Sequence, residues 1–182
     1  MAIRKVAVMG NPILRRKAEQ VPPDQISSPR IQALIDDMIE TQREYGGIGL
    51  AAPQVHEPLA IVALGLDNPP TDDGEDSSYF PRMVLINPKI TEFSTQMEAD
   101  WEGCLSVPDL SGMVKRSVAV TVEGLDRHGN PVKVAAEGWM ARVFQHEIDH
   151  LHGLLYIDRM GDLKTLSFNR ELSRRGVETP AE

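Results

Sequence analysis

Apolar residues recur at helical spacing in two stretches of the chain. The first stretch begins at Ser28-Pro29, a typical N-cap followed by proline at the first helical position, and ends at Gly46-Gly47. The second stretch runs from Trp139 to Leu151 and stops before Gly153. Its apolar positions occupy more than one stripe, which predicts a helix enclosed by the protein instead of one lying on its surface.

Strand-like runs rich in valine, isoleucine, leucine and threonine fill the middle of the chain, at residues 59–64, 83–90, 114–125 and 132–135. A turn at 126–130 joins the last two runs as a hairpin. Because helices flank these strands and no repeat is visible, the sequence predicts a single α+β domain over residues 1–182. Residues 67–78 combine acidic side chains with proline, glycine and serine, which predicts a solvated acidic loop.

The C-terminal segment, residues 160–176, is predicted to form a further helix that is not required for catalysis. Leucines mark one side of it, and basic residues gather on the other, namely Lys164, Arg170, Arg174 and Arg175. One interpretation is a solvated helix. The other is a transient contact with an acidic partner such as ribosomal RNA.

Length and charge narrow the functional class. A chain of 182 residues is long enough to bury a substantial core, and its net charge of −8 argues against specific DNA binding, which needs a basic surface. No apolar run approaches the roughly 18 residues that span a membrane, and residues 1–9 do not form a signal peptide. The single cysteine, Cys104, excludes an internal disulfide. We therefore expect a soluble, cytoplasmic protein.

The second helical stretch contains His-Glu-x-x-His at His146, Glu147 and His150. Residues four apart lie on one face of a helix, so both imidazoles can bind one metal ion. Glu147 is close enough to act on a water at that ion without being a ligand. The competing interpretation is an amphipathic helix with two partly buried histidines and a solvated glutamate.

A metal used in catalysis needs a third protein ligand and an open fourth position. The usual proteases with this motif take the third ligand from a downstream Glu or His, but the next glutamate is Glu171, and His152 is too close. Cys104, next to Gly103, is the better candidate, since two histidines and one cysteine form a known catalytic ligand set. A lone intracellular cysteine is otherwise most often an inert core residue.

Small residues from Gly47 to Ala52 permit a close approach by a strand or a ligand, although a tight turn is the usual reason for such glycines. Gln54 follows them. Its amide either donates to a carbonyl oxygen or caps the turn.

Three segments in this order resemble the peptide deformylase family: Gly47-Ile48-Gly49-Leu50-Ala51-Ala52-Pro53-Gln54, Glu102-Gly103-Cys104-Leu105-Ser106 and Gln145-His146-Glu147-Ile148-Asp149-His150. The resemblance implies antiparallel sheets wrapped around a central helix that carries the His-Glu-x-x-His motif. It also implies a metal-dependent hydrolase that removes the formyl group from the N-terminal methionine of nascent chains. One divalent metal ion on Cys104, His146 and His150 is implied, Fe2+ in the cell and Zn2+, Ni2+ or Co2+ in some preparations.

The resemblance also assigns roles within the site. Glu147 takes a proton from the attacking water and returns it to the leaving amine. The Gln54 side chain and the Leu105 N–H donate to the oxyanion. Gly49 and Gly103 admit an extended substrate peptide as an added strand, and the methionine side chain lies near Ile48, Trp139 and Val143. Trp139 and Arg142 are departures that affect substrate preference.

Some polar residues keep two interpretations. Asp149 either orients a ligand histidine or forms a salt bridge elsewhere, and Glu102 and Arg116 either pair to brace the cysteine loop or make no such contact. The remaining histidines are expected to be surface or structural residues: His56, His128 and His152. Two other functions compete with the hydrolase: a peptidase that uses the same helix, and a catalytically silent binding module with a structural metal.

Overall fold

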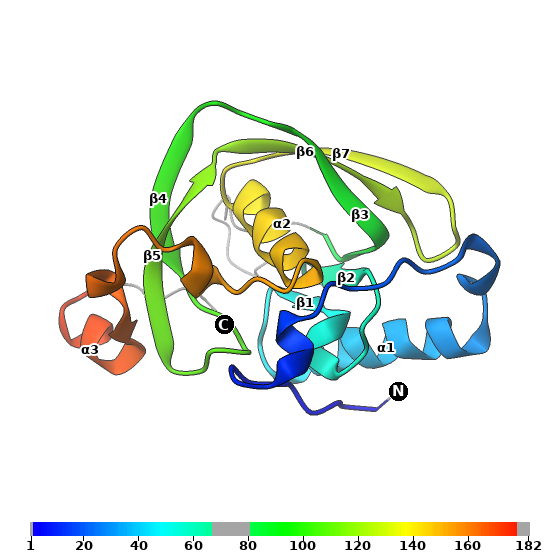
Figure 1. Ribbon diagram of the computed structural model, residues 1–182, viewed down its shortest axis with the longest axis horizontal. Helices are drawn as coiled ribbons and strands as arrows, with labels where there is room; N and C mark the ends of the chain where they lie inside the picture. Colours follow the sequence, from blue (N-terminus) through cyan, green and yellow to red (C-terminus); the bar gives the residue numbers. More distant parts are fainter. Residues whose placement is uncertain (1, 67–80, 178–182) are drawn as a thin grey trace, which may run out of the picture.

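The computed structural model describes residues 2–66 and 81–177, and it places two antiparallel sheets around one central helix (Figure 1). The predicted acidic loop at 67–78 lies outside the described residues. The larger sheet has five strands in the order β1 (Gly49–Ala51), β2 (Ile61–Leu64), β3 (Met83–Phe93), β6 (Ala119–Leu125) and β7 (Pro131–Glu137). The smaller sheet contains β4 (Met97–Glu102), β5 (Leu110–Ser117) and β8 (Ser167–Phe168).

Each long helix begins or ends at the signals seen in the sequence. Helix α1 (Pro29–Glu44) starts after Ser28, whose side chain accepts a hydrogen bond from the Ile31 N–H at 3.4 Å. Helix α2 (Gly138–Leu151) ends just before Gly153, which has a φ of +74°. A short helix, α3, spans Asn169–Arg174. Isolated 3₁₀ turns complete the described chain: Pro12–Arg15, Pro23–Gln25, Ala52–Val55, Tyr156–Arg159 and Leu163–Thr165.

Helix α2 occupies the centre of the fold, as the resemblance implied. Its residues Ala141, Phe144 and Ile148 are buried in one apolar cluster with residues of the larger sheet, among them Val62 and Val122. Figure 1 shows β6 and β7 arching over α2, while β1 and β2 lie on its other side. Such enclosure explains the broad apolar surface of this helix in the sequence.

The run 114–125 is not one strand, contrary to the sequence prediction. It is divided into β5 and β6, which belong to different sheets and are separated by Val118. The side chain of Gln145 on α2 accepts from the Ser117 N–H at 3.1 Å and donates to the Ser117 carbonyl at 2.8 Å. This amide satisfies the backbone groups at the point where the chain leaves one sheet for the other.

The C-terminal helix is also shorter than the predicted 160–176, since α3 covers Asn169–Arg174 alone. Asp162 accepts from the Lys164 N–H at 2.9 Å, which makes a local turn that competes with helix formation. Thr165 accepts from Met113 N at 3.2 Å, and Ser167–Phe168 then pairs with β5. Ser167 and Phe168, which the leucine spacing had assigned to a helix, therefore form a short strand that pairs with the edge of β5.

The described residues contain no helix that combines the length and the apolar character needed to cross a membrane.

Replacing Gln145 with leucine should destabilise the protein, because it leaves the N–H and carbonyl of Ser117 buried without partners. Each such loss typically costs about 1–3 kcal/mol. Thermal unfolding should show a clear decrease in Tm, whereas the matched change Gln20→Leu, at an exposed position, should leave Tm nearly unchanged. An unaltered Tm for Gln145→Leu would contradict the bridging role of this amide.

Candidate active site

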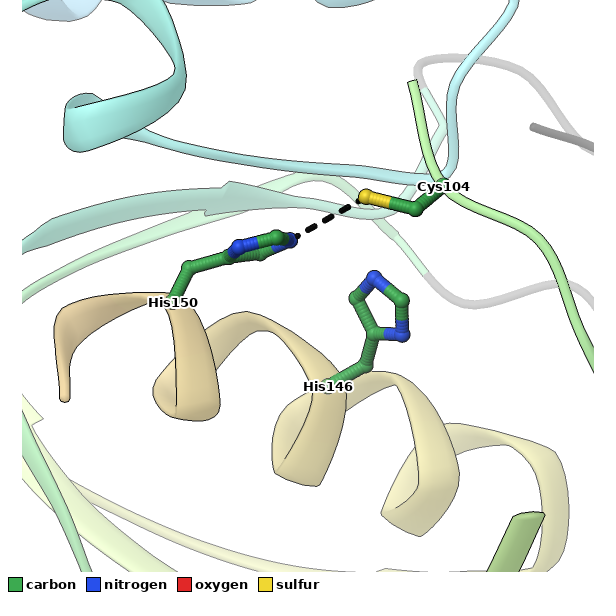
Figure 2. Close-up of side chains that lie close together, drawn as sticks. All are labelled: Cys104, His146 and His150. Atoms are coloured by element: carbon green, nitrogen blue, oxygen red, sulfur yellow. Dashed lines mark hydrogen bonds between the residues drawn. The ribbon is translucent and has the colours of Figure 1, made fainter. Parts of the chain in front are cut away.

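Three potential metal ligands converge where α2 meets the loop after β4. One nitrogen each of His146 and His150 and the sulfur of Cys104 all lie within 4.8 Å of one another. The Cys104 Sγ is 3.3 Å from His150 Nε2, and Figure 2 shows the two imidazoles rising from successive turns of α2 toward the sulfur. The structure thus brings together the three residues that the sequence selected as ligands.

The donor set fits a divalent metal ion. Metal–sulfur bonds of about 2.3 Å and metal–nitrogen bonds of about 2.0–2.1 Å at a tetrahedral angle place sulfur and nitrogen roughly 3.5 Å apart. The observed separation of 3.3 Å between Cys104 and His150 is close to that value. A thiolate and two imidazoles are the ligand types that Zn2+ and Fe2+ accept, and three protein donors leave a position open.

Glu102 determines which nitrogen of His146 faces the cluster. Its Oε2 lies 2.9 Å from His146 Nδ1, at the end of β4. A carboxylate only accepts hydrogen bonds, so Nδ1 carries the proton and Nε2 keeps its lone pair for a metal. Sequence reasoning missed this contact, because the two residues are 44 positions apart.

Glu102 is buried and held by two arginines. Arg116 donates to both of its oxygens at 2.9 Å, and Arg142 donates to Oε1 at 2.7 Å. Burial alone would raise the pKa of Glu102, but the hydrogen bonds from His146 and Arg116 lower it far below its usual value. The pair of Glu102 and Arg116 that the sequence left open is present, whereas the participation of Arg142 was not foreseen.

Asp149 forms salt bridges and does not orient a ligand histidine. Its carboxylate accepts from Arg116 and from both donor atoms of the Arg159 fork, at 3.0 and 2.6 Å. Of the two interpretations left open by the sequence, the salt bridge is therefore correct. The carboxylate beside His146 belongs to Glu102 instead.

Glu147 is buried next to the cluster with an acceptor atom that has no partner among the described residues. Its side chain is 4% exposed, and Oε2 makes no hydrogen bond there. Burial raises the pKa of Glu147 to about 7. A carboxylate with that pKa and a free acceptor is suited to taking a proton near neutral pH.

Gln54 closes the turn, which is one of the two roles considered from the sequence. Its Oε1 accepts from the Ala51 N–H at 2.8 Å, which closes the turn after β1. Its Nε2 points toward the cluster, where it donates to Ser106 Oγ at 3.2 Å and lies 3.6 Å from Cys104 Sγ. The amide is therefore fixed with its donor side toward the site.

One pocket of about 460 Å³ opens onto these groups. Every predicted site residue except His150 lines this pocket. Two further residues line it as well: Glu102, which the sequence had not placed there, and Arg142, which was expected only to affect substrate preference. The full lining is Ile48, Gly49, Gln54, Glu102, Gly103, Cys104, Leu105, Trp139, Arg142, Val143, His146 and Glu147. The other three histidines, His56, His128 and His152, are exposed, as expected.

Comparisons with known proteins agree with this geometry. The family model described as polypeptide deformylase matches residues 3–166. Peptide deformylase 2 of Pseudomonas putida is 43% identical over 170 residues, which cover 93% of this chain and 94% of that relative. Peptide deformylase 1 of Nitrosomonas europaea is 41% identical with the same coverage of both chains.

Solved structures of the same enzyme class also match the fold. The Met-Ala-Ser-bound class I type b peptide deformylase from Acinetobacter baumannii superposes with a TM-score of 0.81 and 36% identity, covering 87% of this chain and 99% of that one. The peptide deformylase from Thermotoga maritima gives 0.76 and 34%, covering 89% of this chain and 100% of that one. The chain therefore belongs to the polypeptide deformylase family.

Proposed function

We propose that Cys104, His146 and His150 hold the catalytic metal of this deformylase and that Glu147 is its general acid and base. Members of the family are metal-dependent hydrolases, and this protein removes the formyl group from the N-terminus of nascent polypeptides. The observation that carries the proposed roles is the convergence of the three ligand atoms within 4.8 Å beside the buried Glu147 carboxylate.

A divalent ion in this site supplies Lewis acidity, which lowers the pKa of a coordinated water toward neutral and polarises a carbonyl group. The chain's own residues do the rest. Glu147 accepts the proton of the attacking water through its unpartnered Oε2 and returns that proton to the nitrogen of the departing amine. His146 keeps the required tautomer because Glu102 accepts from its Nδ1.

The developing oxyanion requires donors that are already in position. We assign this role to the Gln54 side chain and to the N–H of Leu105, the residue next to Cys104. The Gln54 amide is oriented before substrate arrives, because Ala51 fixes its oxygen and Ser106 one of its N–H groups. Preorganised donors of this kind need no rearrangement during the reaction.

The substrate peptide is expected to extend along β1. Strand β1 pairs with β2 on one side, and it is the terminal strand of the described five-stranded sheet, so its other edge can receive an extended peptide. Gly49 and Gly103 lie on the pocket wall, and Ile48, Trp139 and Val143 form an apolar part of it that suits a methionine side chain. The Acinetobacter baumannii relative binds the tripeptide Met-Ala-Ser, which supports this class of ligand.

We further infer that the metal in the cell is Fe2+, with Zn2+, Ni2+ or Co2+ able to replace it in preparations, and that the protein acts in the cytoplasm, where new chains carry the formyl group. A mixed thiolate and imidazole set accepts all of these ions. Metal analysis of protein purified without oxygen from its own cells tests the identity of the ion.

A transient ribosome contact through the C-terminal segment remains part of the proposal. Lys164 lies in the turn Leu163–Thr165 before β8, Arg170 and Arg174 lie in α3, and Arg175 caps that helix. All four are exposed, and none of them lines the pocket. Exposed cations on an otherwise acidic protein favour an anionic partner such as RNA.

Truncation after Asp162 should remove this basic surface and leave the chemistry intact. The shortened protein should bind ribosomes less tightly and have a lower Tm, because β5 loses its partner β8 and the buried Leu172 is gone. Turnover of a short formyl-Met peptide should match that of the full chain. A folded truncated protein without turnover would show that the segment is part of the active site.

Formyl-Met peptides should react far faster than the matched acetyl-Met peptides. The attacked carbon is expected to lie between Cys104, Gln54 and Leu105 on the pocket wall, where a hydrogen fits and a methyl group is crowded. Initial rates on the two peptides measure this preference, with an internal peptide bond as a third substrate. Equal rates on formyl and acetyl peptides would indicate a general amidase, cleavage of the internal bond a peptidase, and no turnover at all a binding module.

Glu147→Gln and Cys104→Ala should separate the base from the ligand. Glu147→Gln keeps the shape of the side chain but cannot take a proton, so metal content should stay normal while kcat falls by about 10²–10⁴-fold. Cys104→Ala removes a ligand, so metal content and activity should fall together.

Both variants should be prepared without oxygen, because a ferrous thiolate site is expected to oxidise in air. Metal content is measured by elemental analysis and activity on the same samples. If Cys104→Ala retains full metal and full turnover, another residue is the third ligand and the proposed site is wrong.

A further inference from the structure

The carboxylate of Glu147 lies directly against Gly49, the first residue of β1. A Cβ atom at position 49 would collide with Glu147 Oε1 and would be 2.5 Å from Cδ and 2.7 Å from Cγ of the same side chain. Optimal separations between non-bonded carbon atoms are about 3.5–4.0 Å. The carboxylate therefore occupies the space that any side chain at position 49 would fill.

The backbone gives no other reason for a glycine at this position. Gly49 is absent from the residues with positive φ, whereas Gly153 has a φ of +74° and would be strained with any side chain. Residue 49 pairs with Leu64 of β2 in ordinary antiparallel register. Alanine is thus compatible with the backbone of the strand, and the nearest atoms that a Cβ would meet all belong to Glu147.

The strand is the fixed partner in this contact, whereas the carboxylate borders the pocket and is the group that a side chain at position 49 would displace. Strand β1 is paired along its whole length with β2, and the adjacent Leu50 and Ala51 are fully buried. Glu147 extends from the central helix α2, is itself 4% exposed, and lines the pocket. Close packing at such a site transmits displacement instead of absorbing it.

We propose that Gly49 is a positioning residue for Glu147: its missing side chain sets where the carboxylate stands relative to Cys104, His146 and His150. This inference rests on the proposed role of Glu147 as general acid and base. It assigns to Gly49 a different task from the one expected from the sequence, in which the glycine admits the substrate backbone. The two tasks predict different kinetic effects.

Gly49→Ala should lower kcat with little change in KM or in metal content. A displacement of about 1 Å at a catalytic group typically costs on the order of 10²-fold in rate. Gly161→Ala is the matched control, since Gly161 has no positive φ and a Cβ added there would meet no atom within 4 Å. If Gly49 serves only to admit the peptide, Gly49→Ala should instead raise KM and leave kcat unchanged, which would overturn the proposal.

A double-variant comparison tests the contact itself. Glu147→Asp shortens the side chain by one methylene and removes Oε1, the atom nearest to the added Cβ, so it should partly relieve the collision in Gly49→Ala. The kcat of Gly49→Ala/Glu147→Asp should then exceed the value expected from multiplying the two single effects. Strictly multiplicative losses would mean that the two residues act independently, and the inference would be wrong.

Stability gives a readout that needs no activity. Gly49→Ala should lower Tm in the native background but leave Tm nearly unchanged in a Glu147→Ala background, where the carboxylate is absent. This pair stays informative even if Gly49→Ala alone folds poorly. Equal losses of Tm in both backgrounds would contradict competition for the same space.

The failures of the two proposals are distinguishable. An active Glu147→Gln variant would overturn the proposed role of Glu147, whatever Gly49→Ala does. An inactive Glu147→Gln together with a fully active Gly49→Ala would leave the function intact and overturn the positioning role of Gly49 alone.

Discussion

The buried carboxylate of Glu102 is the constraint on which the site depends. It stands at the end of β4 and receives hydrogen bonds from Arg116 on β5 and from Arg142 and His146 on α2. A buried carboxylate is costly unless it is fully paired, so these side chains must meet at one point. Because Cys104 follows Glu102 by two residues, the same contacts bring the thiol beside the ligand histidines on α2. The ion-pair network of the small sheet and the metal ligand set are therefore parts of one arrangement.

The sequence predicted helix boundaries and candidate ligands correctly where the residues that interact lie within one helix. The cap at Ser28 and the four-residue spacing of His146 and His150 are examples, since helix geometry alone brings the partners together. The lack of a suitable Glu or His after His150 favoured Cys104 as the third ligand, and the apolar stripes of the second helix predicted its enclosure. None of these inferences required knowledge of how distant elements pack.

The predictions that were wrong depended on contacts between distant residues. Residues 114–125 lie in two strands because the Gln145 side chain, 28 positions after Ser117, hydrogen-bonds the N–H and carbonyl of Ser117 where β5 ends. The C-terminal helix is short because β5 pairs with Ser167–Phe168. The contact between Glu102 and His146, across 44 positions, was missed for the same reason. A pattern of apolar and polar residues contains no information about such pairings, which follow from the assembled sheets.

Cys104, the proposed third ligand, needs more support than the two histidines, because it comes from a loop and not from a helix. Its sulfur is 3.4 Å from the Ser106 N–H and 3.6 Å from the Gln54 amide. The extended N-terminal segment joins both of these neighbours, since Ala7 N donates to the Gln54 carbonyl and Met9 N to the Ser106 carbonyl, each at 2.7 Å.

These contacts affect the chemistry of the sulfur as well as its position. Donors directed at a thiolate withdraw electron density from it, so the sulfur gives less charge to a bound ion. A thiolate ligand by itself makes a milder Lewis acid than an imidazole or carboxylate in its place. With an ion on the proposed ligands, the N–H groups around Cys104 would partly offset that effect, and the N-terminal segment keeps those groups in place.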